Sequence, residues 1–522
     1  MRTKNYDIVV IGASLGGVMA AYSAAKEGKR VILTEETDWI GGQFTSQAVP
    51  PDEHRWIEKF GCTKTYREYR NKVRDFYRRN YPLVDEIRNS DAFDPGNSSV
   101  SRIAHEPRIS LHLLEEMLLP YVSNGNLEII LNCKAVSAKV EEDTIKSVTV
   151  KNICTGALIE LTGKYFIDGT DIGQLLPLTG AEYVIGAESK EMTGEPNAHD
   201  KYEPKDMQAV TWVAAVDYVE GEDYTIEKPE QYEFWRNLIQ PFDKYPVLSW
   251  YGPDSETGKA RKFGMFDDEG EYLFSLWDYR RIIYPGYYKG NFHKNDVTLI
   301  NWPQNDYFLG NLFEDENEEK HIEGARQLTL SFIYWLQTEA PRPDGGKGYK
   351  GIRLRPDVVG TEDGLAKYPY IRESRRIKAE YTVVEGDINA SLRDSLPRFK
   401  DTVGVGSYHI DLHITTVTNS FKFDNNWPFE IPLGAMIPVR IKNLIPGCKN
   451  IGTTHLTNAC FRLHPVEWNI GEVAGYLASH AMDKDKTPSQ IRNDDSMLVE
   501  FQEKLVKSGI ELHWPENEVY VV

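Results

Sequence analysis

Cysteine, long apolar runs and positive charge are all scarce in this 522-residue sequence. It has only five cysteines, scattered and without a Cys-x-x-Cys pair, so neither a disulfide framework nor a cysteine-based zinc site is expected. No apolar run reaches the roughly 18 residues that a membrane span needs. The net charge of −19 repels nucleic acids and anionic membranes. We therefore expect a small-molecule substrate, with no nucleic-acid or membrane partner.

The composition is otherwise that of a globular protein that buries a core. Hydrophobic residues make up 41% and charged residues 27% of the chain, and the length predicts roughly two to four domains. The polar start, Met1–Asp7, has no apolar signal-peptide core. Together with the few, unpaired cysteines, this start leads us to expect a cytoplasmic protein.

The most informative pattern opens the chain, in "VVIGASLGGVMAAYSAAKEGKRVILTEE" (residues 9–36). Tyr6–Ile11 is a β-branched run that predicts a buried strand, and Arg30–Thr34 predicts a second one. Between them, small apolar residues at helical spacing follow a glycine-rich turn that starts at Gly12. The acidic residue Glu35 ends the second strand. A βαβ unit of this kind is typical of dinucleotide binding.

Each polar or glycine position in this unit has a physical role. Gly12 allows the tight turn, Gly17 lets the helix pack closely on the strand, and the helix N-terminus attracts a pyrophosphate. Glu35 can accept hydrogen bonds from ribose hydroxyls, which disfavours the 2′-phosphate of NADP. Ser14 replaces the usual second glycine, and its hydroxyl can donate to phosphate. The unit predicts FAD or NAD and leaves the choice between them open.

The rest of the chain favours a cofactor domain that is interrupted and then resumed. Helices are expected near residues 110–122, 324–340 and 468–483, the last rich in small residues. From about Glu182 to Lys350, tyrosine, tryptophan, proline and charge dominate, which indicates an inserted substrate domain. Only one dinucleotide fingerprint is present, so a separate NAD(P)H domain is not expected.

Four blocks of the sequence together resemble a known family. They are residues 9–46, residues 165–196, residues 370–388 with 403–413, and residues 431–478. As a set they are similar to FAD-dependent oxidoreductases of the glutathione-reductase-like fold. The resemblance implies an α/β protein with FAD as its cofactor. It also implies a discontinuous Rossmann-like FAD-binding domain with an inserted α+β substrate domain. We place the first part of the FAD-binding domain at residues 1–185, the insertion at 186–425 and the C-terminal return at 426–522.

The resemblance also implies which residues hold FAD. The glycine-rich turn and the acid after the second strand would take the adenosine end. A second glycine pair would lie near the pyrophosphate, and the C-terminal block would close over the flavin. The residues so implied are Gly12, Ser14, Leu15, Gly16, Gly17, Glu35, Glu36, Gly41, Gly42, Gln43, Asp168, Gly169, Thr170, Gly452, Asn469 and Gly471. Glu472 departs from the family pattern, which has Gln at that position.

Three residues are candidates for catalysis. His455 lies in the block expected to face the flavin and could act as a general base, because a histidine titrates near neutral pH. His413 is the rival base; it alternates with His409 and Asp411 along a strand, a face that could line a polar cavity or hold a metal. We predict no metal site. Arg375 could clamp an anionic substrate group, or pair with one of the many acids.

These features predict an FAD-dependent oxidoreductase that acts on a small polar substrate, hydroxylated or carboxylated, by hydride transfer to flavin N5. Two alternatives stay open. One is a lyase or isomerase that holds FAD without net redox chemistry, and the other is a flavin- or nucleotide-binding regulatory module.

Overall fold

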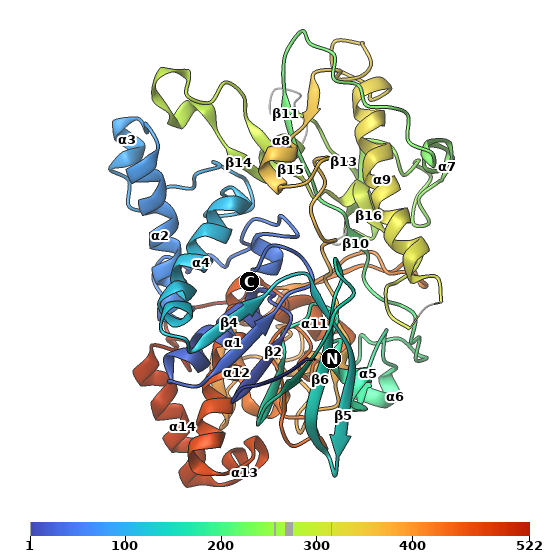
Figure 1. The fold of residues 1–522 in the computed structure, drawn as a ribbon. Coiled ribbons are helices and arrows are strands. Elements are labelled where there is room, and N and C mark those ends of the chain that lie inside the picture. Colours follow the sequence, from blue (N-terminus) through green and yellow to red (C-terminus); the bar gives the residue numbers. More distant parts are fainter. Residues whose placement is uncertain (1, 255–256, 267–274, 315) are drawn as a thin grey trace.

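A five-stranded parallel sheet organises the molecule (Figure 1). The computed structural model describes residues 2–254, 257–266, 275–314 and 316–522. The strands of the central sheet are, in spatial order, β23 (Leu444–Pro446), β8 (Tyr165–Asp168), β2 (Ile8–Ile11), β3 (Val31–Thr34) and β4 (Leu127–Ile130). β2 pairs with β3 on one side and with β8 on the other. Segments from both ends of the chain therefore build one sheet.

The side chains of β2 alternate between two hydrophobic cores. Ile8 and Val10 belong to the larger core, whereas Val9 and Ile11 belong to a second one. All four are at most 1% exposed, as expected for a strand with both faces covered. Because both faces of β2 are buried, its apolar β-branched residues follow one another without polar residues between them.

Helices cover one face of the sheet and a second sheet covers the other. The covering helices are α1 (Leu15–Lys26), α4 (Pro107–Ser123) and α12 (His464–Lys484), and α1 packs directly on α12. The second sheet contains β1 (Arg2–Asn5), β7 (Leu158–Thr162), β6 (Thr144–Asn152) and β5 (Cys133–Glu141). This three-layer arrangement confirms the predicted α/β class.

A second group of elements occupies the upper part of Figure 1. Its main sheet contains β14 (Arg281–Ile283), β15 (Val297–Ile300), β11 (Ala214–Tyr218) and β17 (Ile352–Leu354). Beside it lies α9 (Glu318–Thr338). The sequence predicted this helix at residues 324–340; its start was missed because the first turn is acidic and lacks the apolar spacing on which the prediction relied. These elements fall within the predicted insertion, whose boundaries at 185/186 and 425/426 stay a prediction.

The remaining helices and strands are short or lie at the periphery. The helices are α2 (Lys64–Asn80), α3 (Asp85–Arg88), α5 (Leu175–Thr179), α6 (Lys190–Thr193), α7 (Tyr232–Asn237), α8 (Leu276–Tyr279), α10 (Pro356–Val359), α11 (His455–Phe461), α13 (Pro488–Asn493) and α14 (Asp495–Ser508). The strands are β9 (Tyr183–Val184), β10 (Val210–Thr211), β12 (Tyr251–Asp254), β13 (Lys259–Lys262), β16 (Asp306–Tyr307), β18 (Arg376–Ile377), β19 (Thr402–Gly406), β20 (Ile410–Leu412), β21 (Lys422–Asp424) and β22 (Phe429–Pro432). Across the described ranges, none of these helices combines the length and the apolar character that a membrane crossing requires.

Candidate cofactor groove and active site

The glycines of the opening turn are required by the protein's own backbone. Gly12 has a φ of +85°, and a Cβ there would lie 2.6 Å from the backbone nitrogen of Thr170. A Cβ on Gly16 would lie 1.9 Å from the carbonyl oxygen of Gly447, and one on Gly17 would lie 2.0 Å from that of Gly12. Contacts this short cannot form, so the three glycines let α1 approach β2, the loop after β8 and the loop after β23.

Ser14 occupies the position of the missing second glycine and caps α1. Its side-chain oxygen accepts a hydrogen bond from the backbone N–H of Gly17 at 3.2 Å. This satisfies one of the donors that a helix N-terminus leaves unpaired. The hydroxyl proton of Ser14 remains able to donate to a phosphate, so the substitution is compatible with dinucleotide binding.

Glu35 directly follows β3 and faces the opening turn. One carboxylate oxygen accepts from the backbone N–H of Ala13 at 2.8 Å, and the other accepts from that of Thr37 at 2.9 Å. Burial raises the pKa of Glu35 to about 7, although these hydrogen bonds act in the opposite direction. The carboxylate is therefore held at the mouth of the turn, where a ribose hydroxyl would meet it.

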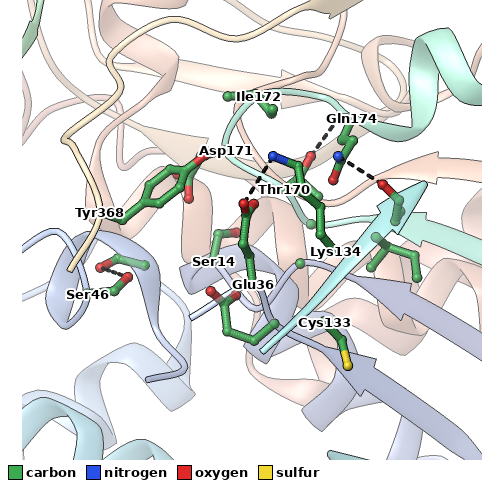
Figure 2. Close-up of a pocket in the computed structure, with 16 residues that line it drawn as sticks. Ser14, Glu36, Ser46, Cys133, Lys134, Thr170, Asp171, Ile172, Gln174 and Tyr368 are labelled. Carbon is green, nitrogen blue, oxygen red and sulfur yellow. Dashed lines mark hydrogen bonds and ion pairs between the residues drawn. The ribbon is translucent and has the colours of Figure 1, made fainter. Parts of the chain in front are cut away.

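A groove runs along the carboxyl edge of the parallel sheet (Figure 2). Seven of the sixteen residues predicted to hold FAD line it: Gly12, Ser14, Glu35, Glu36, Gly42, Gly169 and Thr170. Its lining combines the N-terminal end of α1 with an acid placed for ribose, the features that a dinucleotide requires. The residues present therefore fit the adenosine and pyrophosphate part of FAD.

Several groove residues were not predicted from the sequence. They are Ile11, Ser46, Cys133, Lys134, Ala135, Asp171, Ile172, Gln174 and Tyr368. Lys134 lies at the start of β5, the strand that follows β4 in the chain, and its ammonium lies 3.0 Å from the carboxylate of Glu36. Residues after β4 and β8 could have been found, because the carboxyl ends of parallel strands meet at one edge of the sheet. Tyr368 comes from a loop far along the chain, and it does not follow a strand of this sheet, so the sequence gives no signal for it.

Other predicted cofactor residues shape the protein around the groove. Asp168 accepts hydrogen bonds from the backbone N–H groups of Thr170 and Leu175, at 3.0 and 2.8 Å, and so fixes the turn after β8. Gly41 has a φ of +108° and starts the short 3-10 helix over Gly42–Phe44. Leu15, Gly16 and Gly17 form the first turn of α1. None of these five lines the groove as the structure describes it.

Three predicted residues from the C-terminal block also lie outside the described groove lining. A Cβ on Gly471 would lie 2.0 Å from the carbonyl oxygen of Gly16, so Gly471 lets α12 pack on α1. Asn469 donates to the carbonyl oxygen of Val403 at 3.2 Å. Gly452 is packed against residues 379–381. Their role in cofactor binding stays a prediction.

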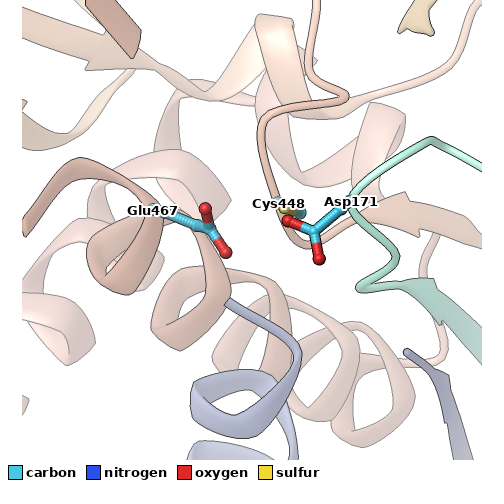
Figure 3. A group of neighbouring side chains, drawn as sticks. All are labelled: Asp171, Cys448 and Glu467. Carbon is cyan, nitrogen blue, oxygen red and sulfur yellow. The ribbon is translucent and has the colours of Figure 1, made fainter. Parts of the chain in front are cut away.

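Next to the groove, the side chains of Asp171, Cys448 and Glu467 lie close together (Figure 3). Asp171, Cys448 and Glu467 approach one another as metal ligands can, but the ammonium of Lys449 lies 2.5 Å from Asp171 and 3.8 Å from Glu467. Burial lowers the pKa of a lysine, but the attraction of the Asp171 carboxylate outweighs this effect. The pKa of Lys449 therefore lies well above its usual range. The lysine thus provides the positive charge that a cation would bring.

Glu467 and Gln43 connect this lysine to the start of α1. Glu467 accepts from the backbone N–H of Gly16 at 3.1 Å and from the side-chain amide of Gln43 at 2.5 Å. The same amide donates to the carbonyl oxygen of Arg462 at 3.1 Å. Within the described ranges, the amide oxygen of Gln43 is buried and has no hydrogen-bond partner. A buried polar atom without a partner is rare in native proteins, and a bound ligand would satisfy it.

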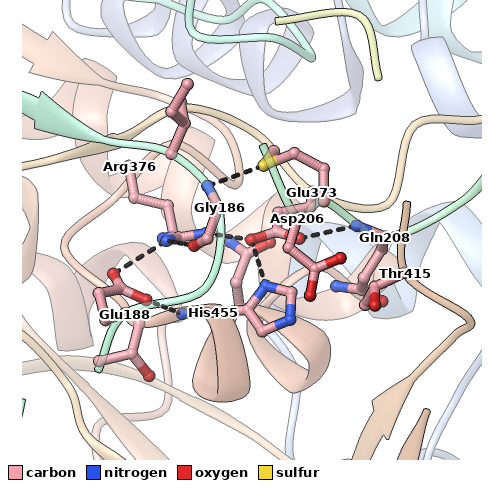
Figure 4. A network of polar contacts seen from close by, with 12 residues as sticks. Gly186, Glu188, Asp206, Gln208, Glu373, Arg376, Thr415 and His455 are labelled. Atoms are coloured by element: carbon pink, nitrogen blue, oxygen red, sulfur yellow. Dashed lines mark hydrogen bonds and ion pairs between the residues drawn. The ribbon is translucent and has the colours of Figure 1, made fainter. Parts of the chain in front are cut away.

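His455 is held in a network of buried charges (Figure 4). Its ring Nδ1 lies 2.8 Å from the carboxylate of Glu373, and its backbone N–H donates to Glu188 at 2.9 Å. Arg376 contacts both carboxylates, and its guanidinium lies 2.8 Å from the carboxylate of Glu188. Burial lowers the pKa of the imidazole, but the attraction of Glu373 outweighs it, so the pKa of His455 is raised.

His413 lies between two carboxylates. Its Nδ1 is 2.6 Å from Asp306, and its Nε2 is 3.4 Å from Asp411. Its backbone N–H donates to the side chain of Gln208 at 3.3 Å, and the backbone N–H of Gln208 donates to Glu373 at 3.0 Å. Gln208 therefore links the two candidate histidines.

Arg375 does not join them. Its guanidinium donates to the carbonyl oxygen of Ile172 at 2.9 Å and lies 3.5 Å from Glu314. Its neighbours Arg372 and Arg376 point to the buried charges instead, since Arg372 lies 2.9 Å from Asp306. Alternation along an extended segment turns Arg375 towards the loop that borders the groove, and its role in binding an anionic substrate group stays a prediction.

We use the name buried ion-pair cluster for this set of charged residues. It comprises Asp52, Glu188, Arg280, Asp306, Arg372, Glu373, Arg376, Asp411, His413, His455 and Arg462. All of them come from loops or short elements, and most are brought together from the second, third and fourth sequence blocks.

Short stretches of the chain are similar to curated proteins. Over 53 residues the chain is 43% identical to the soluble pyridine nucleotide transhydrogenase of Marinomonas sp. (strain MWYL1), a stretch that covers 10% of this chain and 11% of that protein. Over 77 residues it is 38% identical to the digeranylgeranylglycerophospholipid reductase of Methanocaldococcus jannaschii, with 14% and 18% covered. The chain therefore matches less than a fifth of the length of these curated relatives.

Two solved structures match the chain over most of its length, at low sequence identity. E. coli quinol fumarate reductase is matched over 97% of this chain and 74% of its own, at 9% identity and a TM-score of 0.35. A geranylgeranyl bacteriochlorophyll reductase-like protein of Thermoplasma acidophilum is matched over 98% and 85%, at 12% identity and a TM-score of 0.34.

A family profile supplies the assignment, because the profile described as "FAD dependent oxidoreductase" matches residues 7–505, nearly the whole chain. This confirms the predicted FAD cofactor and the predicted enzyme class. The chain belongs to the FAD dependent oxidoreductase family.

Proposed function

We propose that this enzyme oxidises a hydroxyl-bearing carbon of a small polar organic substrate, with His455 as the general base. When bound, FAD supplies the acceptor for the hydride that leaves the carbon. The hydroxyl proton needs a separate acceptor, because the C–H bond gives its electron pair to the flavin. The remaining electrons of the O–H bond form the new carbonyl bond.

The free nitrogen of His455 is the observation that carries this proposal. Its Nδ1 is engaged by Glu373, while its Nε2 is buried and, as far as the chain is described, has no hydrogen-bond partner. Both ring nitrogens of His413 face carboxylates instead. His455 therefore keeps one nitrogen available for a substrate proton, whereas His413 does not.

Glu373 positions this base. With its Nδ1–H donated to the carboxylate, the neutral imidazole presents the lone pair of Nε2. The same carboxylate stabilises the imidazolium that forms when Nε2 takes the proton. Arg376 contacts both Glu373 and Glu188 and so places a positive charge beside these two buried acids.

The groove would hold the adenosine end of FAD. Glu35 would accept from the ribose, and the N-terminus of α1 with the Ser14 hydroxyl would face the pyrophosphate. Gln43 reaches from this side to Arg462, a member of the buried ion-pair cluster. This contact supports a flavin end that lies between the groove and the cluster.

Anaerobic flavin reduction tests the proposal. A panel of alcohols, sugars and hydroxy acids identifies a compound that bleaches the oxidised holoenzyme. His455→Asn should then retain FAD and slow bleaching on the order of 100- to 10,000-fold. The matched control is His513→Asn, since His513 also pairs with a glutamate, Glu430 at 2.7 Å, but its side chain is 57% exposed.

Two results would contradict the proposal. Bleaching at the parent rate in His455→Asn would remove His455 from the proton transfer. Conversion of a compound without any bleaching would favour the lyase or isomerase alternative. A coloured protein that neither bleaches nor converts any panel compound would favour a regulatory flavin module.

A further inference from the structure

Each arginine of the buried ion-pair cluster has a carboxylate of its own. The pairs are Arg280 with Asp52 at 3.1 Å, Arg372 with Asp306 at 2.9 Å, Arg462 with Asp411 at 3.5 Å, and Arg376 with Glu188 at 2.8 Å and with Glu373. The four guanidinium groups are at most 9% exposed. Buried charges of this kind are tolerated because they compensate one another.

The charge balance of the cluster leaves no positive excess. Four arginines face five carboxylates, and the two histidines contact three of these same carboxylates. A substrate carboxylate or phosphate would therefore bring an additional negative charge into a buried region that is already balanced. Such a charge is costly unless a protein group neutralises it.

Hydrogen-bonding atoms without a partner among the described residues remain at the cluster, both on neutral amides and at the Nε of Arg280, Arg372, Arg376 and Arg462. Three amide side chains, each at most 3% exposed, have atoms with no hydrogen-bond partner among the residues that the structure covers: Gln43 Oε1, Gln208 Nε2 and Asn301 Nδ2. All three residues contact the cluster: the amide of Gln43 donates to the carbonyl oxygen of Arg462, the backbone N–H of Gln208 donates to Glu373, and the amide oxygen of Asn301 lies 3.4 Å from Arg372. Donors and acceptors are both represented, which matches hydroxyl groups.

We infer that the substrate is a neutral molecule with several hydroxyl groups, such as a sugar or a cyclic polyol, rather than a carboxylate or a phosphate. The inference rests on the proposed function for its location, and it decides between the hydroxylated and carboxylated substrates that the sequence leaves open. Hydroxyl groups satisfy the unpartnered amides without adding charge.

Calorimetric titration of the oxidised holoenzyme tests this without any redox readout. The probes are matched pairs: glucose with glucuronate, and galactose with galacturonate, with myo-inositol as a further neutral probe. At about pH 7.5 the uronates are ionised, and the neutral member of a pair should bind about tenfold or more tightly. Uronates that bind more tightly than their sugars overturn the inference, and so does a panel in which no neutral probe binds.

A charge-removing variant sharpens the test. Asp306→Asn keeps the side-chain shape but leaves Arg372 without its charge partner, so the affinity for uronates should rise about tenfold. The matched control is Asp217→Asn: Asp217 is 1% exposed and pairs with Arg353 and Arg355, away from the cluster. The control should leave uronate binding unchanged.

Asp411→Asn, which frees Arg462, is the second variant if Asp306→Asn does not fold. Uronate affinity that stays at the parent value in a folded variant contradicts the charge argument. Failures of the two proposals can be told apart. A sugar that binds without bleaching the flavin defeats the hydride transfer but not the substrate class. A uronate that bleaches the flavin and binds more tightly than its sugar supports the hydride transfer but defeats the neutral substrate class.

Discussion

The cofactor groove and the buried ion-pair cluster are built on different principles. The shape of the groove is determined by the backbone, at glycines and at the ends of strands. Glu35 is the main functional side chain that faces the opening turn. The cluster consists of side chains from many segments, each held by a partner of opposite charge. The first kind of site depends on local backbone geometry, and the second depends on charge compensation. Four measurements test this difference, in order of expected effect.

Removal of a cluster arginine should have the largest effect. Arg376→Met leaves the carboxylates of Glu373 and Glu188 buried without their cation, which should lower the free energy of unfolding by about 3–5 kcal/mol. The control is Arg236→Met, because Arg236 is 45% exposed and pairs with Glu339 on the surface. That control should cost less than about 1 kcal/mol. Denaturant unfolding measures both, and equal small losses would mean that the cluster is not held by charge pairing.

In the groove, a side-chain substitution should weaken the binding of FAD. Glu35→Ala removes a charge-assisted acceptor for the ribose, which should weaken FAD binding by about 1.5–3 kcal/mol. Fluorescence titration of the apoprotein with FAD measures this. Unchanged affinity at equal fold stability would shift the role to Glu36 or to backbone groups.

Backbone packing around the groove should respond to a single methyl group. Gly471→Ala places a Cβ against the carbonyl oxygen of Gly16, and overpacking of this kind costs about 1–3 kcal/mol of stability. Gly386→Ala is the control, because a Cβ at Gly386 meets nothing within 4 Å. Thermal unfolding compares the two. If Gly471→Ala loses FAD affinity at parent stability, Gly471 contributes to binding rather than to packing.

The smallest effect should be the pH dependence of FAD binding. Burial raises the pKa of Glu35 to about 7, so below that pH the carboxyl is protonated and must lose its proton to accept two ribose hydrogen bonds. The affinity of the apoprotein should therefore rise as pH increases towards 7, by at most about tenfold per pH unit, and level off above it. Glu35→Gln should remove the slope, and a slope that persists would assign the titration to another group.

Many residues of the groove could be predicted because their pattern is local. The β-branched run of β2, the glycines after it and the acid after β3 all lie within the first 35 residues. Each has a cause that acts between neighbours in sequence: double burial of a strand, a positive φ at Gly12, or the cap that Ser14 places on α1. The family resemblance then selected FAD over NAD, and the family profile agrees.

The prediction of catalytic residues was less complete. His455 and His413 were chosen as titratable residues in the right blocks, but their partners Glu373 and Asp306 come from other segments. Arg375 was chosen from three arginines close in sequence, and the structure turns it away from its neighbours. Spacing within a segment does not state which side chain meets a partner from elsewhere.

The sequence by itself determined the βαβ unit and its suitability for a dinucleotide, because hydrophobic periodicity and glycine requirements are short-range properties of the chain. The resemblance of four sequence blocks to a known family added the α/β class and the choice of FAD. Tertiary structure decided which carboxylate compensates each buried arginine, which nitrogen of His455 stays free and that Lys449 stands among the acids of Figure 3. The physical reason is that buried charges must be neutralised across space, between residues whose separation along the chain has no fixed relation to their distance.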